Sequence, residues 1–208
     1  MIVSVAFDSR EGDPNQWVEA AKPGYVTLID RNHYVAELYN MVNVNQAVWI
    51  DEAGIIVRPT ESAGAYEGFR KMNRETFKVP EDVATITADA KTTYYNALRD
   101  WVNKGAASEY AFDAGQARAH LALPTENTIR AHAAFSLGQH LLRIGQAEEG
   151  KRFVAEASRL HPDSWNVWRQ GAGVSDRGLA SNADFWARVD ALGDKKYYAS
   201  VDMKGMPQ

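Results

Sequence analysis

The pattern of apolar residues changes near residues 72–80, and this change limits the architectures that the chain can adopt. Before it, short β-branched runs bounded by turn residues indicate strands; they lie at 2–8, 25–30, 46–51 and 55–59. After it, helical spacing prevails between Pro, Asp and Gly residues; the longest segments are 80–105, 127–145 and 146–162. The sequence therefore predicts an α/β region over residues 1–75, followed by a helical region over residues 80–208.

The segment of the first region with the clearest strand–turn–strand pattern is QAVWIDEAGIIVRP, residues 46–59. QAVWID and IIVRP are each long enough for one strand, and the intervening EAG is a turn sequence. Two short strands joined by a tight turn normally pair side by side. The stretch therefore predicts an antiparallel hairpin.

Three aspartates, Asp8, Asp30 and Asp51, each end an apolar strand. Ligands of open α/β sheets bind at the carboxyl ends of strands, so an acidic site is conceivable there. Each aspartate also stands where a helix or turn begins, and its carboxylate can accept hydrogen bonds from the backbone. We expect this capping role at all three positions.

The chain contains no cysteine, and this excludes several kinds of chemistry. Disulfides, thiolate nucleophiles, cysteine–zinc sites and iron–sulfur clusters all require cysteine sulfur. Thiol-redox catalysis is therefore excluded for this chain, and other enzyme activity is left open. The five histidines have no metal-ligand spacing, so we predict neither a metal nor a cofactor.

The charge and the hydropathy of the chain argue against nucleic acids and membranes as partners. The net charge of −4 provides no basic footprint for a nucleic acid. No apolar run approaches the roughly 20 residues needed to cross a bilayer. The initial residues MIVSVAFDSREGD lack the basic and apolar regions of a signal peptide. We therefore expect a cytoplasmic protein without nucleic-acid or membrane partners.

Residues 2–70 resemble the later part of a redoxin domain, the thioredoxin-fold group that includes alkyl hydroperoxide reductases and membrane-tethered thiol reductases. The matching strings are VSVAFD and YVTLID…HYVAELYNMVNVNQAVWIDEAGIIVRP. In the family, a strand and a helix with the reactive cysteine precede the strand that matches VSVAFD. This chain has no counterpart to either, so the resemblance implies a truncated thioredoxin-like sheet.

The resemblance also indicates where the sheet would be open. The absent strand lies in the family's sheet between the strands that match residues 2–8 and 46–51. Without it, backbone donors and acceptors are exposed along both neighbours. These neighbours could pair directly, a second chain could complete the sheet, or sequence upstream of Met1 could supply the strand. We expect completion in a homodimer, because sheet edges favour symmetric pairing.

The proline that flanks the thiol in the family, and that is preceded by a cis bond, matches Asn45. A cis bond before a non-proline residue costs about 2.5–4 kcal/mol. We therefore expect a trans bond before Asn45. Asn45 and Gln46 adjoin the open middle of the implied sheet, which makes them candidate binding residues.

Residues 131–162 resemble a single tetratricopeptide unit. The matching positions are Leu137-Gly138, Leu141, Gly145, Ala157 and Pro162, while Gly150 replaces the usual Ala. The resemblance implies a helical hairpin at residues 127–162. Because one such unit cannot bury its own face, we expect the hairpin to pack on neighbouring helices or on another subunit. A peptide-binding groove is the alternative.

Trp165 and Trp168 are the other candidate binding residues. They are three positions apart, so they lie on one side of a helix. Tryptophan is used both to fill cores and to anchor interfaces. Both interpretations are open at this point.

The segment TESAG, residues 60–64, approaches the G-x-S-x-G nucleophile elbow of serine hydrolases. Ser62 would be the nucleophile, with a histidine and an acid from elsewhere. However, Thr60 replaces the first glycine, which the strained turn needs for its lack of a Cβ atom. A capping hydroxyl is the interpretation that we favour.

Together these patterns predict a non-redox, thioredoxin-like binding or assembly protein. It would act through protein–protein contacts, as a homodimer or with a protein or peptide partner. One alternative is a serine-dependent hydrolase that uses Ser62. The other is a fragment of a thiol-dependent redoxin whose catalytic cysteine lies upstream.

Overall fold

The computed structural model describes residues 1–7, 14–174 and 182–207 of the chain. The fold is mixed α/β, with more helix than strand and two small sheets. It divides into two compact units. The first comprises Met1–Asn43 and Ala122–Asn182, and the second comprises Val44–Leu121 and Ala183–Gln208. The chain therefore passes between the units three times, and this division does not follow the predicted boundary at residues 75–80.

The sheet of the first unit consists of two parallel strands, β1 (Val3–Ala6) and β2 (Val26–Ile29). Helix α1 (Asn15–Ala21) lies between them in the sequence, as a parallel connection requires. The strands are in register from Val3 opposite Val26 to Ala6 opposite Ile29. Both are almost entirely apolar, a pattern typical of parallel strands that are covered on both faces.

Helix α2 (Tyr34–Leu38) follows β2 through an aspartate cap. The Asp30 carboxylate accepts hydrogen bonds from the Tyr34 and Val35 amides at 3.0 and 2.7 Å. In the second unit, Asp51 likewise accepts the amides of Ala53 and Ile55 at 2.9 and 2.8 Å. The predicted capping role is confirmed for Asp30 and Asp51, whereas Asp8 lies outside the described residues.

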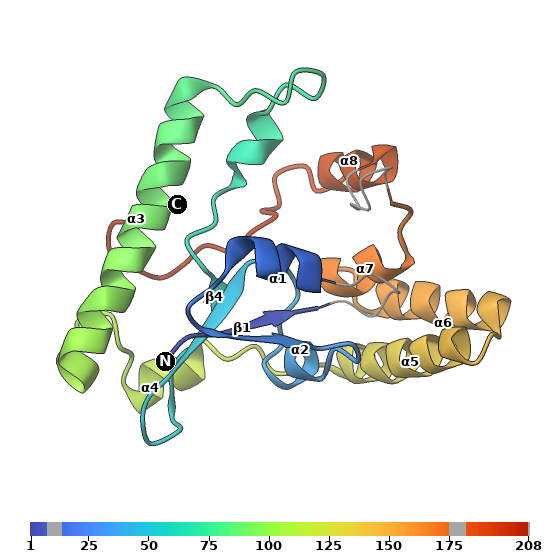
Figure 1. The fold of residues 1–208 in the computed structure, drawn as a ribbon, viewed down its shortest axis with the longest axis horizontal. Coiled ribbons are helices and arrows are strands. Elements are labelled where there is room, and N and C mark those ends of the chain that lie inside the picture. Colours follow the sequence, from blue (N-terminus) through green and yellow to red (C-terminus); the bar gives the residue numbers. More distant parts are fainter. Residues whose placement is uncertain (8–13, 175–181, 208) are drawn as a thin grey trace. The chain divides into compact units, whose positions relative to one another are not determined.

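Three helices complete the first unit: α5 (Glu126–Arg143), α6 (Ala147–Leu160) and α7 (Trp165–Gly171). Figure 1 shows α5 and α6 side by side, as a hairpin. The chain reverses at Gly145, whose φ of 83° is accessible to glycine at little cost. The helices are close at Gly138 and Gly150, where an added Cβ at either position would lie 2.9 Å from the other's carbonyl oxygen.

The second unit contains the antiparallel strands β3 (Gln46–Ile50) and β4 (Ile56–Ser62), which confirm the predicted hairpin. The 3-10 helix η1 (Glu67–Lys71) follows them and precedes the long helix α3 (Glu81–Lys104). The remaining elements are η2 (Gly105–Ala107), α4 (Ala114–Ala119) and α8 (Ala183–Asp190).

The core of the second unit forms between β3, α3 and the C-terminal tail. Ala90, Tyr94 and Ala97 follow each other on one face of α3 and are fully buried. Trp49 of β3 packs against this face, with its ring stacked on that of Trp101 at 5.2 Å. The tail adds its own buried apolar side chains, Val201, Met203 and Met206.

The peptide bond between Val44 and Asn45 is cis. The expected trans bond is therefore wrong. That expectation considered only the intrinsic preference of a non-proline peptide bond, and the structure has the other isomer.

Among the described residues, no helix is both long enough and apolar enough to span a bilayer.

Candidate functional site

The four predicted binding residues form two pairs in different units. Asn45 is exposed and Gln46 is half-buried, next to each other at the start of β3. The Asn45 carbonyl accepts the Ala63 amide at 3.0 Å, and Gln46 lies opposite Ser62 in the hairpin. Their backbones thus hold β3 and β4 together, and the Asn45 side chain faces solvent.

Trp165 and Trp168 belong to α7 in the first unit. Trp165 is only 4% exposed, and its ring meets that of Trp168 edge-on at 5.7 Å. The helix is capped by the Ser164 hydroxyl, which accepts the Val167 amide at 3.2 Å. Trp165 therefore packs within its own unit, whereas half-buried Trp168 retains surface that a partner can reach.

Ser62 is the last residue of β4 and is 2% exposed. Thr60 and Glu61 also belong to the strand, so the sharp strand-to-helix turn of a nucleophile elbow is absent at this position. The histidine of the second unit, His120, directs its ring nitrogens to the Gln116 carbonyl and the Asp202 carboxylate at 2.8 and 3.0 Å. This geometry gives the hydrolase hypothesis no support.

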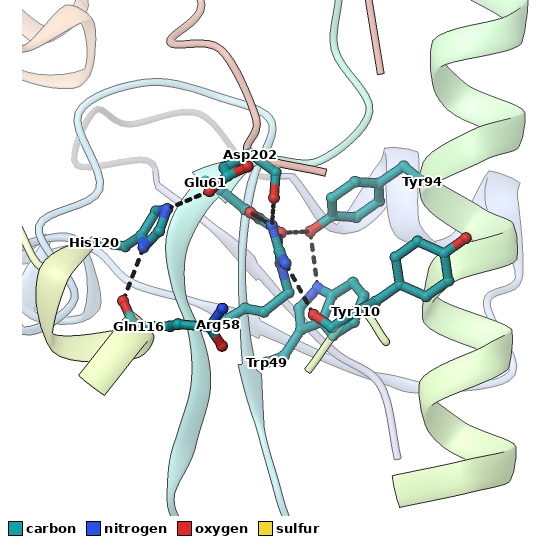
Figure 2. A network of polar contacts seen from close by, with 8 residues as sticks. All are labelled: Trp49, Arg58, Glu61, Tyr94, Tyr110, Gln116, His120 and Asp202. Carbon is teal, nitrogen blue, oxygen red and sulfur yellow. Dashed lines mark hydrogen bonds and ion pairs between the residues drawn. The ribbon is translucent and has the colours of Figure 1, made fainter. Parts of the chain in front are cut away.

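A polar network centred on Arg58 is the feature of the second unit that sequence reasoning missed. Arg58 projects from β4 and is 1% exposed, between Trp49 and Phe112, whose ring centroids lie 5.3 and 4.1 Å from its Cζ. Its guanidinium donates two hydrogen bonds to the Glu61 carboxylate, at 2.8 and 2.7 Å. Figure 2 shows this pair in the middle of the network.

The remaining donors of Arg58 reach main-chain oxygens far along the chain. They contact the carbonyls of Tyr110 at 2.8 Å and Asp202 at 2.9 Å. One side chain thereby connects β4, the segment before α4 and the C-terminal tail. The sequence carried one signal for it, because an arginine in an apolar strand with an acid three residues on can form a buried pair.

Tyr94 extends the network into α3. Its hydroxyl accepts a hydrogen bond from the Trp49 indole at 2.8 Å and donates one to Glu61 at 2.9 Å. Burial raises the pKa of Tyr94 far above its ordinary value, and the negative charge of Glu61 is the second-largest cause of this shift. Because the donors and acceptors are used within the protein, the network holds the unit together rather than presenting a reactive group.

A pocket of about 480 Å³ lies between η1 and residues 189–207 of the second unit. Arg70 at its wall is bound to Glu67 and to the carbonyls of Gly193 and Lys195. Arg74 is paired with Asp190 through two hydrogen bonds, at 2.5 and 2.9 Å. Both guanidinium groups are therefore already occupied by this unit's own oxygens.

An open groove of about 840 Å³ runs between α5 and α6 of the first unit. Its lining includes the apolar side chains of Leu137 and Phe153 and three arginines: Arg130, Arg152 and Arg159. A peptide-binding groove on this hairpin was the alternative expected from the sequence, without particular residues. Residues at spacings of three and four along both helices were the available signal.

Within the described part of the chain, no three histidine or acidic side chains are grouped so that they could hold a metal ion.

No protein-family model, no curated protein and no solved structure matches the chain.

Proposed function

We propose that this chain is a thiol-independent binding or assembly protein, built on an incomplete redoxin-like sheet, which associates with a second copy through strand β1. The observation that carries the proposal is the separation of the four strands in the described residues into two sheets. β1–β2 is a parallel pair and β3–β4 an antiparallel pair. A redoxin-like sheet without the strand between β1 and β3 is expected to leave these two pairs.

The apolar surface of the first pair supports this proposal. Val3 of β1 and Val26 and Leu28 of β2 are 46, 46 and 50% exposed. Strands of this composition normally lie beneath other elements, and a two-stranded sheet is marginal in water. A surface of this kind is stabilised when another strand or chain covers it.

The backbone of β1 supports the same mode of association. Ala6 directs its carbonyl oxygen to the Asp30 amide beyond β2, at 2.8 Å. Because successive residues of a strand alternate in direction, Val5 directs its backbone groups to the opposite edge. That edge can accept a strand from a second copy, and a two-fold axis would place the two β1 strands antiparallel.

The test is the mass of the full chain in solution, by sedimentation equilibrium across micromolar concentrations. The proposal expects a dimer, and expects Val3→Lys to weaken it, because a lysine beside a strand edge opposes pairing. Val102→Lys is the matched control, since Val102 is an exposed apolar residue of α3. A monomer at every concentration, or equal effects of the two substitutions, would count against assembly through β1.

The separated strand pairs also favour a second candidate, a piece of a thiol-dependent redoxin. In that case a strand and a cysteine-bearing helix would be encoded before Met1. The DNA upstream decides between them: an open reading frame with such a segment supports the second candidate. A stop codon close to Met1 supports the thiol-independent protein.

A further inference from the structure

The groove between α5 and α6 presents two apolar stripes to solvent. On α5 the lining residues are Arg130, Ala133, Ala134 and Leu137, at the spacing of one helical face. On α6, Phe153 and Leu160 line the other wall. Leu137 is 42% exposed, whereas Phe153 and Leu160 are half-buried, and the Arg152 guanidinium lies over the Phe153 ring with its Cζ 4.5 Å from the centroid.

Another side of the hairpin is already filled. Phe135 of α5 and Val154 and Ala157 of α6 form a buried cluster with Val167 of α7. Figure 1 shows α7 next to this hairpin. The hairpin thus has one packed side and one side with an open groove.

The charges along the groove favour an acidic occupant. Arg159 pairs with Glu156 at 2.6 Å, Arg152 pairs with Glu149, and Arg130 has no ion-pair partner among the described residues. The Arg152 and Arg159 side chains are 64 and 67% exposed. Exposed pairs of this kind contribute only about 0–1 kcal/mol, so these arginines can turn to an incoming carboxylate at little cost.

The pKa of Glu156 reports how these arginines are arranged. It is lowered first by the hydrogen bond from Arg159, and then by the charges of Arg159, Arg130 and Arg152. With Glu149 and Glu156 paired to two of them, the three arginines leave one positive charge without a paired acid at the groove. An additional acid brought by a ligand would face excess positive charge.

The walls of the groove determine the backbone conformation of the occupant. Both walls are helices, whose backbone groups are already hydrogen-bonded, so an extended peptide would find no backbone partners over the apolar side chains of the lining. A helix satisfies its own backbone and can set its side chains between those of α5 and α6. The α5 stripe from Arg130 to Leu137 spans about 10 Å at 1.5 Å per residue, which is about two helical turns.

We propose that the α5–α6 groove binds an amphipathic α-helix of a partner protein, whose apolar stripe is flanked by Asp or Glu residues. The apolar stripe of the partner helix packs on Leu137 and Phe153. Its flanking carboxylates pair with Arg130, Arg152 and Arg159. This site is independent of the exposed β1 edge, because it is formed by different elements.

The probe is a fluorescently labelled peptide of about 18 residues, long enough to form an isolated helix. Leucines at spacings of three and four form its apolar stripe, and glutamates flank them. One control peptide has lysines in place of the glutamates, and another has a central proline that breaks the helix. Fluorescence anisotropy with the full-length chain measures binding at low and high salt.

The proposal expects saturable, salt-sensitive binding of the glutamate peptide, with at least roughly tenfold weaker binding of both controls, a difference of about 1.4 kcal/mol. Arg130→Glu and Leu137→Asp should each weaken binding of the glutamate peptide about tenfold or more. Arg118→Glu is the matched control, because Arg118 is an exposed arginine of α4. Circular dichroism verifies that each variant keeps its helix content.

Three results would overturn the proposal. The first is no saturable binding of the glutamate peptide below about 1 mM. The second is equal binding of the lysine peptide, or equal effects of Arg130→Glu and Arg118→Glu. The third is a dimer of the full chain that Leu137→Asp dissociates while Val3→Lys does not, since the groove would then be occupied by a second copy.

Discussion

At the scale of single residues, the second unit depends on a charged side chain that has almost no contact with water. Arg58 and Glu61 are 1 and 12% exposed, and they bond to each other through two hydrogen bonds. A buried pair contributes modestly in total, since both charges lose their hydration. Removing one partner is costly, because the other charge then remains buried without compensation.

We predict that Arg58→Met lowers the free energy of unfolding by about 3–5 kcal/mol. It leaves the Glu61 carboxylate with the Tyr94 hydroxyl as its remaining partner in the network. Urea unfolding followed by near-ultraviolet circular dichroism measures this loss. The double variant Arg58→Met, Glu61→Leu should lose less than the single variant, and a greater loss in the double variant would contradict the account.

At the scale of elements, hydrophobic periodicity and helix termini were sufficient to predict the three longest helices of the described chain. Residues 80–105 became α3, and residues 127–145 and 146–162 became α5 and α6, with differences of a few residues at the ends. Helix α4 was not predicted, although its start carries a complete capping box between Asp113 and Gln116. Its six residues are too few for periodicity to reveal.

The close approach of α5 and α6 predicts the effect of adding one methyl group. A Cβ at Gly138 would lie 2.9 Å from the Gly150 carbonyl oxygen and 2.9 Å from a Val154 methyl group. We expect Gly138→Ala to lower the free energy of unfolding by about 1–3 kcal/mol, since the helices must separate. Ser136→Ala, at an exposed position of the same helix, is the control. Thermal unfolding compares them, and an equally stable Gly138→Ala would show that the helices can adjust.

Two histidines at the end of this hairpin predict a pH dependence. The rings of His132 and His161 lie 6.1 Å apart. Burial lowers the pKa of both, and the charge of His132 lowers that of His161 further, while Glu37 and Asp163 oppose these shifts. Folding therefore disfavours protonation at both positions.

The stability of the protein should accordingly fall as the pH falls. Above the ordinary histidine pKa of about 6.5, both histidines are neutral in the folded and in the unfolded chain. Their contribution to the free energy of unfolding is then independent of pH. Below it, the unfolded chain binds protons that the folded chain resists, so the melting temperature should decrease. Calorimetry should show a shallower decrease for His132→Gln, His161→Gln. An unchanged dependence of the melting temperature on pH in this double variant would contradict the prediction. The control is His140→Gln, because His140 is exposed on α5.

At the scale of the whole molecule, each unit is assembled from two separate stretches of the chain. In the second unit, Trp49 from the hairpin packs in one core with Tyr94 of α3 and Val201 of the tail. The predicted regions, 1–75 and 80–208, would separate these residues. Only the long-range contacts reveal this, because nothing in the local pattern links Trp49 in the hairpin to Val201 in the tail.

We predict that residues 1–75 and residues 80–208, produced as separate proteins, do not fold independently. The first would expose Trp49 and Arg58, and the second would lack the strands that cover Tyr94. Near-ultraviolet circular dichroism and cooperative thermal unfolding of each fragment are the measurements. A fragment 80–208 that unfolds cooperatively, with native aromatic signals, would favour the boundary predicted from sequence.

The sequence by itself determined the local elements and the exclusion of chemistry that requires cysteine sulfur in this chain. Short β-branched runs, helical spacing and the Asp30 and Asp51 caps act over a few residues, so neighbours in the chain are enough to specify them. The absence of cysteine needs no structure at all. Tertiary structure alone decided the parallel pairing of β1 with β2, the burial of Arg58 and the shape of the groove on α5 and α6. These depend on contacts between distant residues, whose partners no local pattern names.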